Sequence, residues 1–319
     1  MSIVCTGSIA FDYLMTFPGY FRDHIIPEHL EKISLSFLVD SMIRQKGGTA
    51  PNIAYTLALL GEHPKVMGTV GVDFEEYREW LEQRCVDTSL IRVISGEYTA
   101  SFFANTDLAN SQIASFYTGA MSHASELSIR YLDNEKPDLV IISPNDPKAM
   151  VKYARECAEL KIPYLYDPSQ QIVRMDPRDL RKGVESAQSL FINDYEFELV
   201  QKHTKMTLKD LLGYLDFMVV TRGENGASIY TKNDEVKIRA VKPDKIADPT
   251  GVGDAFRGGF VRGFKLGLDW ETCGQMGALA ATYCLERRGT LNHAYSCEEF
   301  VERYQKCFGS TDSVKKILV

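Results

Sequence analysis

The chain has 319 residues, of which 45% are hydrophobic and 25% charged, a composition typical of a globular protein rather than a disordered one. Its 36 lysines and arginines against 43 aspartates and glutamates give a net charge of −7, which argues against a protein whose main partner is a nucleic acid or an anionic membrane. No apolar run approaches the ~18 residues that span a bilayer, and the N-terminus resembles a first strand rather than a signal peptide, so we expect a soluble, cytoplasmic protein.

Two helices are expected in the first part of the chain. Residues 52–60 place Ile53, Leu57 and Leu60 on one face, with a glycine just past the end of the helix. Residues 73–76, Asp-Phe-Glu-Glu, are typical of a capping box that opens a second helix.

Strand signals without intervening helices surround these two helices. They cover residues 34–44, 99–105 and 111–117, and several of them alternate polar with apolar residues. We interpret these strands as a small β-sheet that projects from the main body as a lid, formed by segments 12–46 and 98–119.

From residue 139 onward, strand and helix signals alternate. Apolar strands are expected at 139–143, 162–166, 190–192 and 217–220. Asp-Pro pairs at 146–147 and 176–177 each supply an N-cap and a proline at the first helical position. This alternation is typical of βαβ units and a parallel sheet covered on both faces. We therefore predict one α/β domain over residues 1–319, a doubly wound and mostly parallel sheet with the small lid.

Polar residues directly follow four of these strands. They lie at 143–146, 167–171, 193–196 and 221–223. One such loop could be ordinary turn chemistry, but ligands of open α/β sheets bind outside the carboxyl ends of the strands. Four polar strand ends together predict a ligand crevice.

The segment 248–260, Asp-Pro-Thr-Gly-Val-Gly-Asp-Ala-Phe-Arg-Gly-Gly-Phe, carries the strongest motif. Gly251 and Gly253 free the backbone just before a predicted helix, so the amides at its N-terminus can bind an anion. Asp254 at this position could simply cap the helix. A carboxylate beside a phosphate site also makes sense as the acceptor of a proton from a hydroxyl that attacks phosphorus.

Several other classes of site are disfavoured. The chain has no G-x-x-x-x-G-K-[ST] segment and no G-x-G-x-x-G after the first strand, which argues against a P-loop enzyme and a dinucleotide-binding dehydrogenase. The seven cysteines form no C-x-x-C pair, which favours reduced, mostly buried thiols. The six histidines show no metal-ligand spacing, so we expect no zinc site.

Segment 248–260 resembles the second signature of the ribokinase-like (PfkB) sugar and nucleoside kinases. Gly47-Gly48-Thr-Ala-Pro-Asn52-Ile-Ala54 resembles their first signature, residues 193–196 match their N-x-x-E, and residues 221–226 match their T-[KR]-G-x-x-G. The order and spacing fit over nearly the whole chain. Within the family the chain is most similar to the bacterial adenosine kinases, through segments 6–12, 27–30, 34–40, 112–117 and 167–171.

The resemblance implies the same fold as the residues do, and it also implies roles. Asp254 would be the catalytic base, and the amides of Gly251, Val252 and Gly253 would form the anion hole. Asp12 would hold the ribose hydroxyls, since an ionised carboxylate accepts from two vicinal donors.

Further substrate-binding residues follow from the same resemblance. Gly47, Gly48 and Asn52 would lie against the ribose, and Phe102 and Phe116 on the lid strands would stack on a base, although such rings are as often core. Ser8, Ser36, Gln170, Gln171 and Arg174 would contact the nucleoside.

The resemblance also places ATP, Mg²⁺ and a monovalent cation such as K⁺. Asn193, Thr221, Gly223, Gly226 and Gly253 would line the ATP site, and Glu196 would lie near Mg²⁺ through water. Asn193 and Glu196 could instead be an ordinary helix cap and first-turn acid. Asp248 and Thr250 lie where relatives bind a monovalent cation.

The function that this pattern favours is phosphorylation of adenosine by ATP to give AMP and ADP. The close alternative is the same chemistry on another nucleoside or a sugar, such as inosine, cytidine, ribose or a fructose phosphate. An alternative of another class is a nucleoside-binding regulator without catalysis, which the intact Asp254, Asn193 and Glu196 disfavour. The partner would be a small molecule, with no nucleic acid and no membrane, and the exposed lid sheet would pair two copies of the chain.

Overall fold

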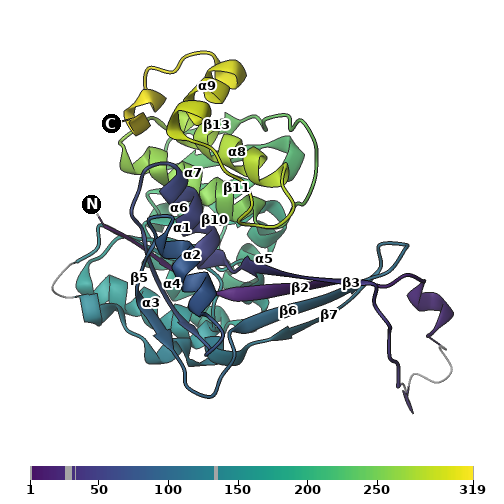
Figure 1. The fold of residues 1–319 in the computed structure, drawn as a ribbon. Helices are drawn as coiled ribbons and strands as arrows, with labels where there is room; N and C mark the ends of the chain where they lie inside the picture. The colour runs from purple at the N-terminus through teal and green to yellow at the C-terminus, as the bar shows by residue number, and fades with distance from the viewer. Residues whose placement is uncertain (1, 26–30, 33, 133–135, 319) are drawn as a thin grey trace.

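The computed structural model describes residues 2–25, 31–32, 34–132 and 136–318 (Figure 1). Within them lies a nine-stranded sheet of order β13-β12-β11-β10-β9-β8-β1-β4-β5. Its strands are β1 (Ile3–Thr6), β4 (Lys65–Val70), β5 (Asp87–Val93), β8 (Leu139–Ile142), β9 (Tyr164–Tyr166), β10 (Ser189–Asn193), β11 (Phe217–Thr221), β12 (Ala227–Thr231) and β13 (Glu235–Ile238). All pairs from β5 to β11 are parallel, whereas the β11–β12 and β12–β13 pairs are antiparallel.

Helices cover both faces of this sheet, because successive strand residues point to opposite sides. Ile141 belongs to one buried cluster, whereas its neighbours Val140 and Ile142 belong to the other. The first cluster packs against α1 (Thr49–Leu59), α2 (Glu75–Glu82), α7 (Val252–Lys265) and α8 (Trp270–Leu285). The second packs against α3 (Pro147–Leu160), α4 (Pro177–Glu185), α5 (Asp194–Thr204) and α6 (Leu208–Tyr214). The predicted doubly wound, mostly parallel sheet is confirmed.

A second, four-stranded sheet of order β3-β2-β6-β7 extends to one side of this body (Figure 1). It consists of β2 (Ala10–Thr16), β3 (Ser41–Gly47), β6 (Ala100–Thr106) and β7 (Gln112–Tyr117). The separate smaller sheet agrees with the sequence prediction, and below we call these four strands the lid sheet.

The strand expected over 34–44 was placed too early. Residues 34–40 have no regular structure, and β3 begins at Ser41, where pairing with Thr16 of β2 starts. The segment 27–30, one of those resembling bacterial adenosine kinases, lies outside the described residues.

The capping box expected at 73–76 is also wrong. Helix α2 begins at Glu75 after Phe74, with no side-chain cap. The Asp73 carboxylate instead accepts from the backbone N–H and the hydroxyl of Thr99, at 2.8 and 2.7 Å. Glu76 pairs with Lys46 of β3 at 2.7 Å. Asp73 therefore binds the residue just before β6, and Glu76, in the first turn of α2, binds β3, so neither caps the helix.

The two predicted Asp-Pro helix starts are confirmed. Asp146 accepts from the N–H of Ala149 at the start of α3, and Asp176 accepts from the N–H of Arg178 at the start of α4. The last helix, α9 (Cys297–Phe308), packs with α8 in a smaller apolar cluster. Over the described ranges, no helix combines the length and apolar character that a membrane crossing requires.

Candidate active site

The four polar strand ends lie next to one another, as predicted, because β8, β9, β10 and β11 are neighbours in the sheet. In a parallel sheet their carboxyl ends share one edge. The N-terminus of α7, the first turns of α1 and the lid sheet supply most of the other predicted residues, and a hydrogen bond from Asn52 to Asp254 joins the two helices.

Helix α7 begins without a side-chain cap. Its N-cap, Gly251, has φ of 75°, and a Cβ there would lie 2.8 Å from the Cβ of Thr290. A larger residue would therefore be both strained and crowded. The first-turn amides of Val252 and Gly253 have no partner within the helix, which is the condition for binding an anion.

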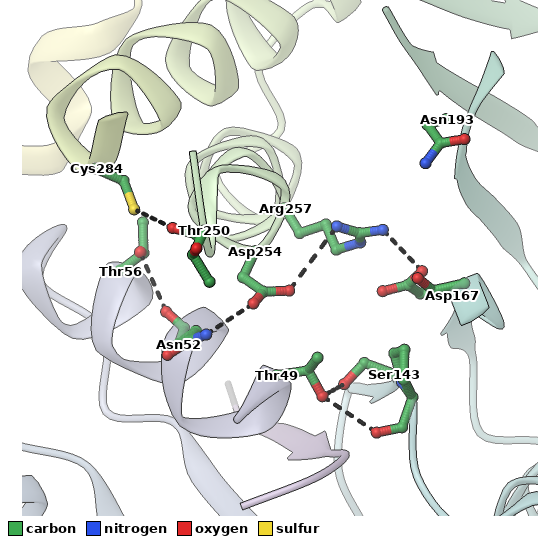
Figure 2. Close-up of polar contacts among 12 residues, drawn as sticks. Thr49, Asn52, Thr56, Ser143, Asp167, Asn193, Thr250, Asp254, Arg257 and Cys284 are labelled. Atoms are coloured by element: carbon green, nitrogen blue, oxygen red, sulfur yellow. Dashed lines mark hydrogen bonds and ion pairs between the residues drawn. The ribbon is translucent and has the colours of Figure 1, made fainter. Parts of the chain in front are cut away.

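Asp254 lies in this first turn and is 9% exposed. Its Oδ2 accepts from Asn52 Nδ2 at 2.8 Å (Figure 2). Burial raises the pKa of the Asp254 carboxyl to about 6, against the opposing effects of Arg257 and Asn52. The carboxyl is therefore largely ionised at neutral pH and close to the range in which a carboxylate acts as a base.

Arg257, one turn further along α7, links Asp254 to the sheet edge (Figure 2). One terminal nitrogen lies 2.7 Å from Asp167 Oδ1 and the other 3.9 Å from Asp254 Oδ1. Asp167 directly follows β9 and its side chain is 1% exposed. Burial, reinforced by the Glu196 and Asp254 carboxylates and opposed by Arg257, raises the pKa of Asp167 to about 7.

Asp12 lies on β2, at the base of the lid sheet. Burial and the charge of Asp248 raise its pKa to about 6. A Cβ on Gly47 would come within 2.7 Å of the Asp12 Oδ2, and Gly48 has φ of 101°, where a Cβ would lie 2.5 Å from the Ser8 carbonyl oxygen. The two glycines thus allow the backbone to pass close to Asp12.

The predicted aromatic residues form a row with Asp12. Asp12 lies opposite Phe102 between β2 and β6, and Phe102 lies opposite Phe116 between β6 and β7. Residues in register share one face of a sheet, with Cβ atoms roughly 5 Å apart. Phe116 is 47% exposed, so its ring is not packed in a core.

Asn52 has a second feature typical of a ligand contact. Its side chain is buried, its amide N–H₂ faces Asp254, and its amide oxygen has no hydrogen-bond partner among the described residues. Buried polar atoms are rarely left unpaired, so this oxygen is a candidate acceptor for a substrate hydroxyl.

The remaining predicted substrate residues are dispersed. Ser8 accepts from the N–H of Thr49 at the start of α1. Gln171 is buried with an unpaired Oε1, whereas Gln170 and Arg174 in the same loop are exposed. Ser36 is exposed in the stretch 34–40, and no hydrogen bond among the described residues joins it to the others.

Asn193 and Glu196 form a reciprocal capping box at the start of α5. The Asn193 side chain accepts from the Glu196 N–H at 2.8 Å, and Glu196 Oε2 accepts from the Asn193 N–H at 2.9 Å. Glu196 Oε1 accepts from Ser169 at 2.9 Å. The structural alternative that the sequence left open is therefore present, and it does not conflict with a water-mediated contact to a cation.

Thr221 ends β11 beside Asn193. The turn after it contains Gly223 with φ of 54° and Gly226 with φ of 82°, and a Cβ on Gly226 would lie 2.0 Å from the Ile238 carbonyl oxygen. These residues extend the same sheet edge beyond Asn193.

Asp248 organises the loop before α7. Its two oxygens accept from the N–H groups of Thr250 and Gly289, at 2.9 and 3.0 Å. Although burial favours the neutral form, these bonds hold the pKa of Asp248 below its usual value. In the described part of the chain, no cluster of three or more His, Cys, Asp or Glu side chains is placed to hold a metal ion.

Sequence reasoning did not assign roles to Arg257 and Asp167. Arg257 lies in segment 248–260 and Asp167 in segment 167–171. The signal that could have indicated a role for Arg257 is its spacing from Asp254, three residues apart on one helix face. The contact from Arg257 to Asp167 joins residues 90 positions apart and could not be predicted from spacing.

Comparison with known proteins finds relatives over nearly the whole chain. The model of the pfkB family of carbohydrate kinases matches residues 10–296. Nucleoside kinase of Methanocaldococcus jannaschii is 30% identical over 95% of this chain and 97% of its own. Its crystal structure, of a ribokinase family member, matches with a TM-score of 0.86 over 96% of this chain and 98% of that one.

Two further proteins are similar over most of their length. The structure of Burkholderia thailandensis nucleoside kinase in complex with inosine is 36% identical, with a TM-score of 0.84 over 98% of this chain and 99% of that one. The same kinase in complex with ADP-inosine gives a TM-score of 0.82 at 36% identity, over 98% of this chain and 97% of that one. Cytidine kinase of Thermococcus kodakarensis is 28% identical over 84% of this chain and 97% of its own.

Proposed function

The chain belongs to the pfkB family of carbohydrate kinases, and on that premise we propose that it transfers the γ-phosphoryl group of ATP to the 5′-hydroxyl of a nucleoside. The observation that carries the nucleoside proposal is the row Asp12, Phe102, Phe116 on one face of the lid sheet. It sets a carboxylate beside two aromatic rings. A carboxylate accepts hydrogen bonds from a ribose diol. An aromatic ring stacks on the flat face of a base, and a free sugar has no such face.

Asp254 would act on the acceptor hydroxyl. As the 5′-oxygen bonds to the γ-phosphorus, the bond from that phosphorus to the β–γ bridging oxygen breaks, ADP leaves, and the hydroxyl proton passes to an Asp254 oxygen. The α7 amides of Val252 and Gly253 would stabilise the charge on the transferring group. Closure of the lid sheet would exclude water and so limit hydrolysis of ATP.

The nucleotide would lie along the sheet edge formed by Asn193, Thr221, Gly223 and Gly226. Mg²⁺ would neutralise phosphate charge there. It retains water ligands and needs few carboxylates besides the phosphates, which fits Glu196, whose oxygens already accept bonds from Asn193 and Ser169. Asp248 and the Thr250 backbone are candidates to hold K⁺ beside the N-terminus of α7.

Adenosine is our first candidate acceptor. The sequence segments that resemble bacterial adenosine kinases support it, whereas similarity to a kinase whose structure contains inosine supports inosine. The base edge decides between them: adenosine presents an amino donor at position 6 and inosine an oxo acceptor. The buried Gln171, with its unpaired Oε1, is the described side chain of this loop that could read such a difference.

The test is release of ADP from ATP and Mg²⁺ with adenosine, inosine, cytidine, ribose and fructose 6-phosphate in turn. We expect kcat/KM for at least one purine nucleoside to exceed that for ribose by roughly a hundredfold, since base stacking and ring contacts are lost with the sugar alone. Higher activity on ribose or fructose 6-phosphate than on every nucleoside would contradict the proposal.

We also propose that the lid sheet pairs two copies of the chain. On the face opposite Asp12, Met42 and Ile113 are more than 40% exposed, and Phe103, which stacks on Tyr13, is 37% exposed. Such an apolar face is typical of an interface. Light scattering should give twice the 35.9 kDa chain mass, and Phe103→Glu should give a monomer. A wild-type monomer at high micromolar concentration would contradict this proposal.

A further inference from the structure

Arg257 is a nearly buried cation with most of its donors unused. Its side chain is 13% exposed, and its Nε has no hydrogen-bond partner among the described residues. One terminal nitrogen donates to Asp167, whereas the other lies 3.9 Å from Asp254, beyond hydrogen-bond distance. A guanidinium offers five N–H donors, and burying them unpaired is unfavourable, so this environment is incomplete without a further acceptor.

The position of Arg257 indicates what that acceptor is. A Cβ on Gly253 would lie 2.8 Å from an Arg257 terminal nitrogen, so the guanidinium lies against the first turn of α7. From there the side chain extends past Asp254 toward Asp167 and the strand end that carries Asn193 (Figure 2). It therefore lies between the carboxylate that would take the proton and the residues that would line the nucleotide site.

Arg262, on the same helix, shows how a purely structural arginine is bound in this protein. Its Nε donates to the Leu60 carbonyl at 2.9 Å, and a terminal nitrogen pairs with Glu62, which also binds Lys265. It holds the end of α1 against α7. Arg257, by contrast, makes one hydrogen bond among the described residues, although three carboxylates, Asp254, Asp167 and Glu196, raise its pKa against the effect of burial.

We propose that Arg257 binds the phosphoryl group being transferred and that Asp167 is the positioning residue that holds its guanidinium. This inference rests on the proposed kinase function. The free N–H groups of Arg257 would donate to the non-bridging oxygens of the γ-phosphoryl as its bond to the ADP oxygen breaks and the bond to the acceptor oxygen forms. Arginine suits this task because its planar fork matches two phosphate oxygens. Asp167 fixes one side of the fork and leaves the other side free.

The test compares a nucleotide that has the third phosphoryl group with one that lacks it. Binding of AMP-PNP and of ADP, each with Mg²⁺ and without nucleoside, is measured by titration calorimetry for wild type, Arg257→Gln and Arg262→Gln. We expect Arg257→Gln to raise the Kd for AMP-PNP by roughly tenfold or more and the Kd for ADP by less than about threefold, because a charge-assisted fork to one group is lost. Arg262→Gln should lower the Tm and leave the ratio of the two Kd values unchanged.

Three further variants address folding and the role of Asp167. Arg257→Lys keeps the charge and loses the fork, so it should fold and show an intermediate loss for AMP-PNP. Asp167→Asn should weaken AMP-PNP binding by roughly threefold or more and add no further loss in the Arg257→Gln background, as expected for residues that act as a unit. The double variant also removes both members of the Arg257–Asp167 ion pair, so neither is left as an unpaired buried charge.

Equal losses for AMP-PNP and ADP in Arg257→Gln and in Arg257→Lys would overturn this inference and leave the kinase proposal intact. Additive effects of the Asp167 and Arg257 substitutions would overturn the positioning role of Asp167. A wild-type protein that binds neither nucleotide would instead overturn the proposed function, and this inference with it.

Discussion

The amide of Asn52 donates to the carboxylate of Asp254 across 202 residues of sequence, at 2.8 Å. This bond joins segment 47–54 to segment 248–260, because Asn52 lies in the first turns of α1 and Asp254 in the first turn of α7. It fixes the orientation of the carboxylate and favours its ionised form.

Loss of this bond should therefore make the Asp254 carboxyl easier to protonate. A hydrogen bond to a charged group contributes roughly 1.5–3 kcal/mol, so in Asn52→Ala we expect the acidic limb of the kcat profile to move up by about one to two pH units. A pH series from 5 to 9 measures it. Asn52→Ala with an unchanged acidic limb would show that the bond does not tune the base.

The raised pKa of Asp254 also predicts an effect on stability. Its folded-state pKa of about 6 lies above its unfolded value, so the folded state favours the protonated form. This contribution is present below the unfolded pKa of about 4 and is lost as the pH rises through about 6. Asp254→Asn, which mimics the protonated form, should have a higher free energy of unfolding than wild type at pH 8, by at most about 3 kcal/mol, and so a higher Tm. It should lose that advantage near pH 4.5. An equally stable or less stable Asn variant at pH 8 would contradict this.

Asp12 should discriminate for the ribose diol. If its carboxylate accepts from the two vicinal hydroxyls, 2′-deoxyadenosine and 3′-deoxyadenosine should each lose roughly ten- to a hundredfold in kcat/KM. Because the pKa of Asp12 is about 6, the KM for the nucleoside should rise as the pH falls below that value. The discrimination should shrink in Asp12→Ala. Equal use of adenosine and its deoxy analogues by wild type would mean that the diol is not recognised.

The two lid-sheet rings should bind the base and not merely stabilise the sheet. Phe116→Ala with Phe102→Ala should raise the KM for adenosine by roughly tenfold or more, at ~1–3 kcal/mol per stacking contact, and affect residual phosphorylation of ribose much less. Because Phe116 is 47% exposed, its loss should change the Tm little. Phe103→Ala is the matched control, because it removes a ring that stacks on Tyr13 on the opposite face and none from the Asp12 face. Phe103 lies on the proposed dimer face, so the oligomeric state of each variant is measured beside its KM. A double variant with a lower Tm and an unchanged adenosine-to-ribose preference would refute the stacking role.

The fold was predictable where the signal is local. Asp146 and Asp176 each cap the helix that begins at the next residue, so the contact lies within a few residues of sequence. The alternation of apolar strands with helices is likewise visible within each segment. Asp73 and Glu76 show the limit: their spacing predicted a capping box, but Asp73 binds Thr99, just before β6, and Glu76 binds Lys46 of β3. A competing partner distant in sequence cannot be seen in a four-residue window.

The local geometry of the candidate site was predictable to the same extent, whereas the roles of its residues stay predictions. Glycines with positive φ and an acid at a helix start, such as Gly251 and Asp254, leave a trace in sequence because few residues tolerate those positions. The Arg257–Asp167 pair leaves none, since it depends on the distance between the end of β9 and the second turn of α7. For Asp12, Phe102 and Phe116 the sequence named the residues and their lid strands, but it could not show that they lie in one row, which depends on strand register.

The most direct test of the proposed chemistry is turnover by Asp254→Asn with ATP, Mg²⁺ and the best purine nucleoside from the acceptor panel. A positioned general base contributes ~10²–10⁴-fold, so kcat should fall by that factor while titration calorimetry shows nucleoside affinity within about threefold of wild type. The remaining product should still be the 5′-monophosphate. A correctly folded Asn variant with near-wild-type kcat would contradict the account, because it would remove Asp254 from the transfer step.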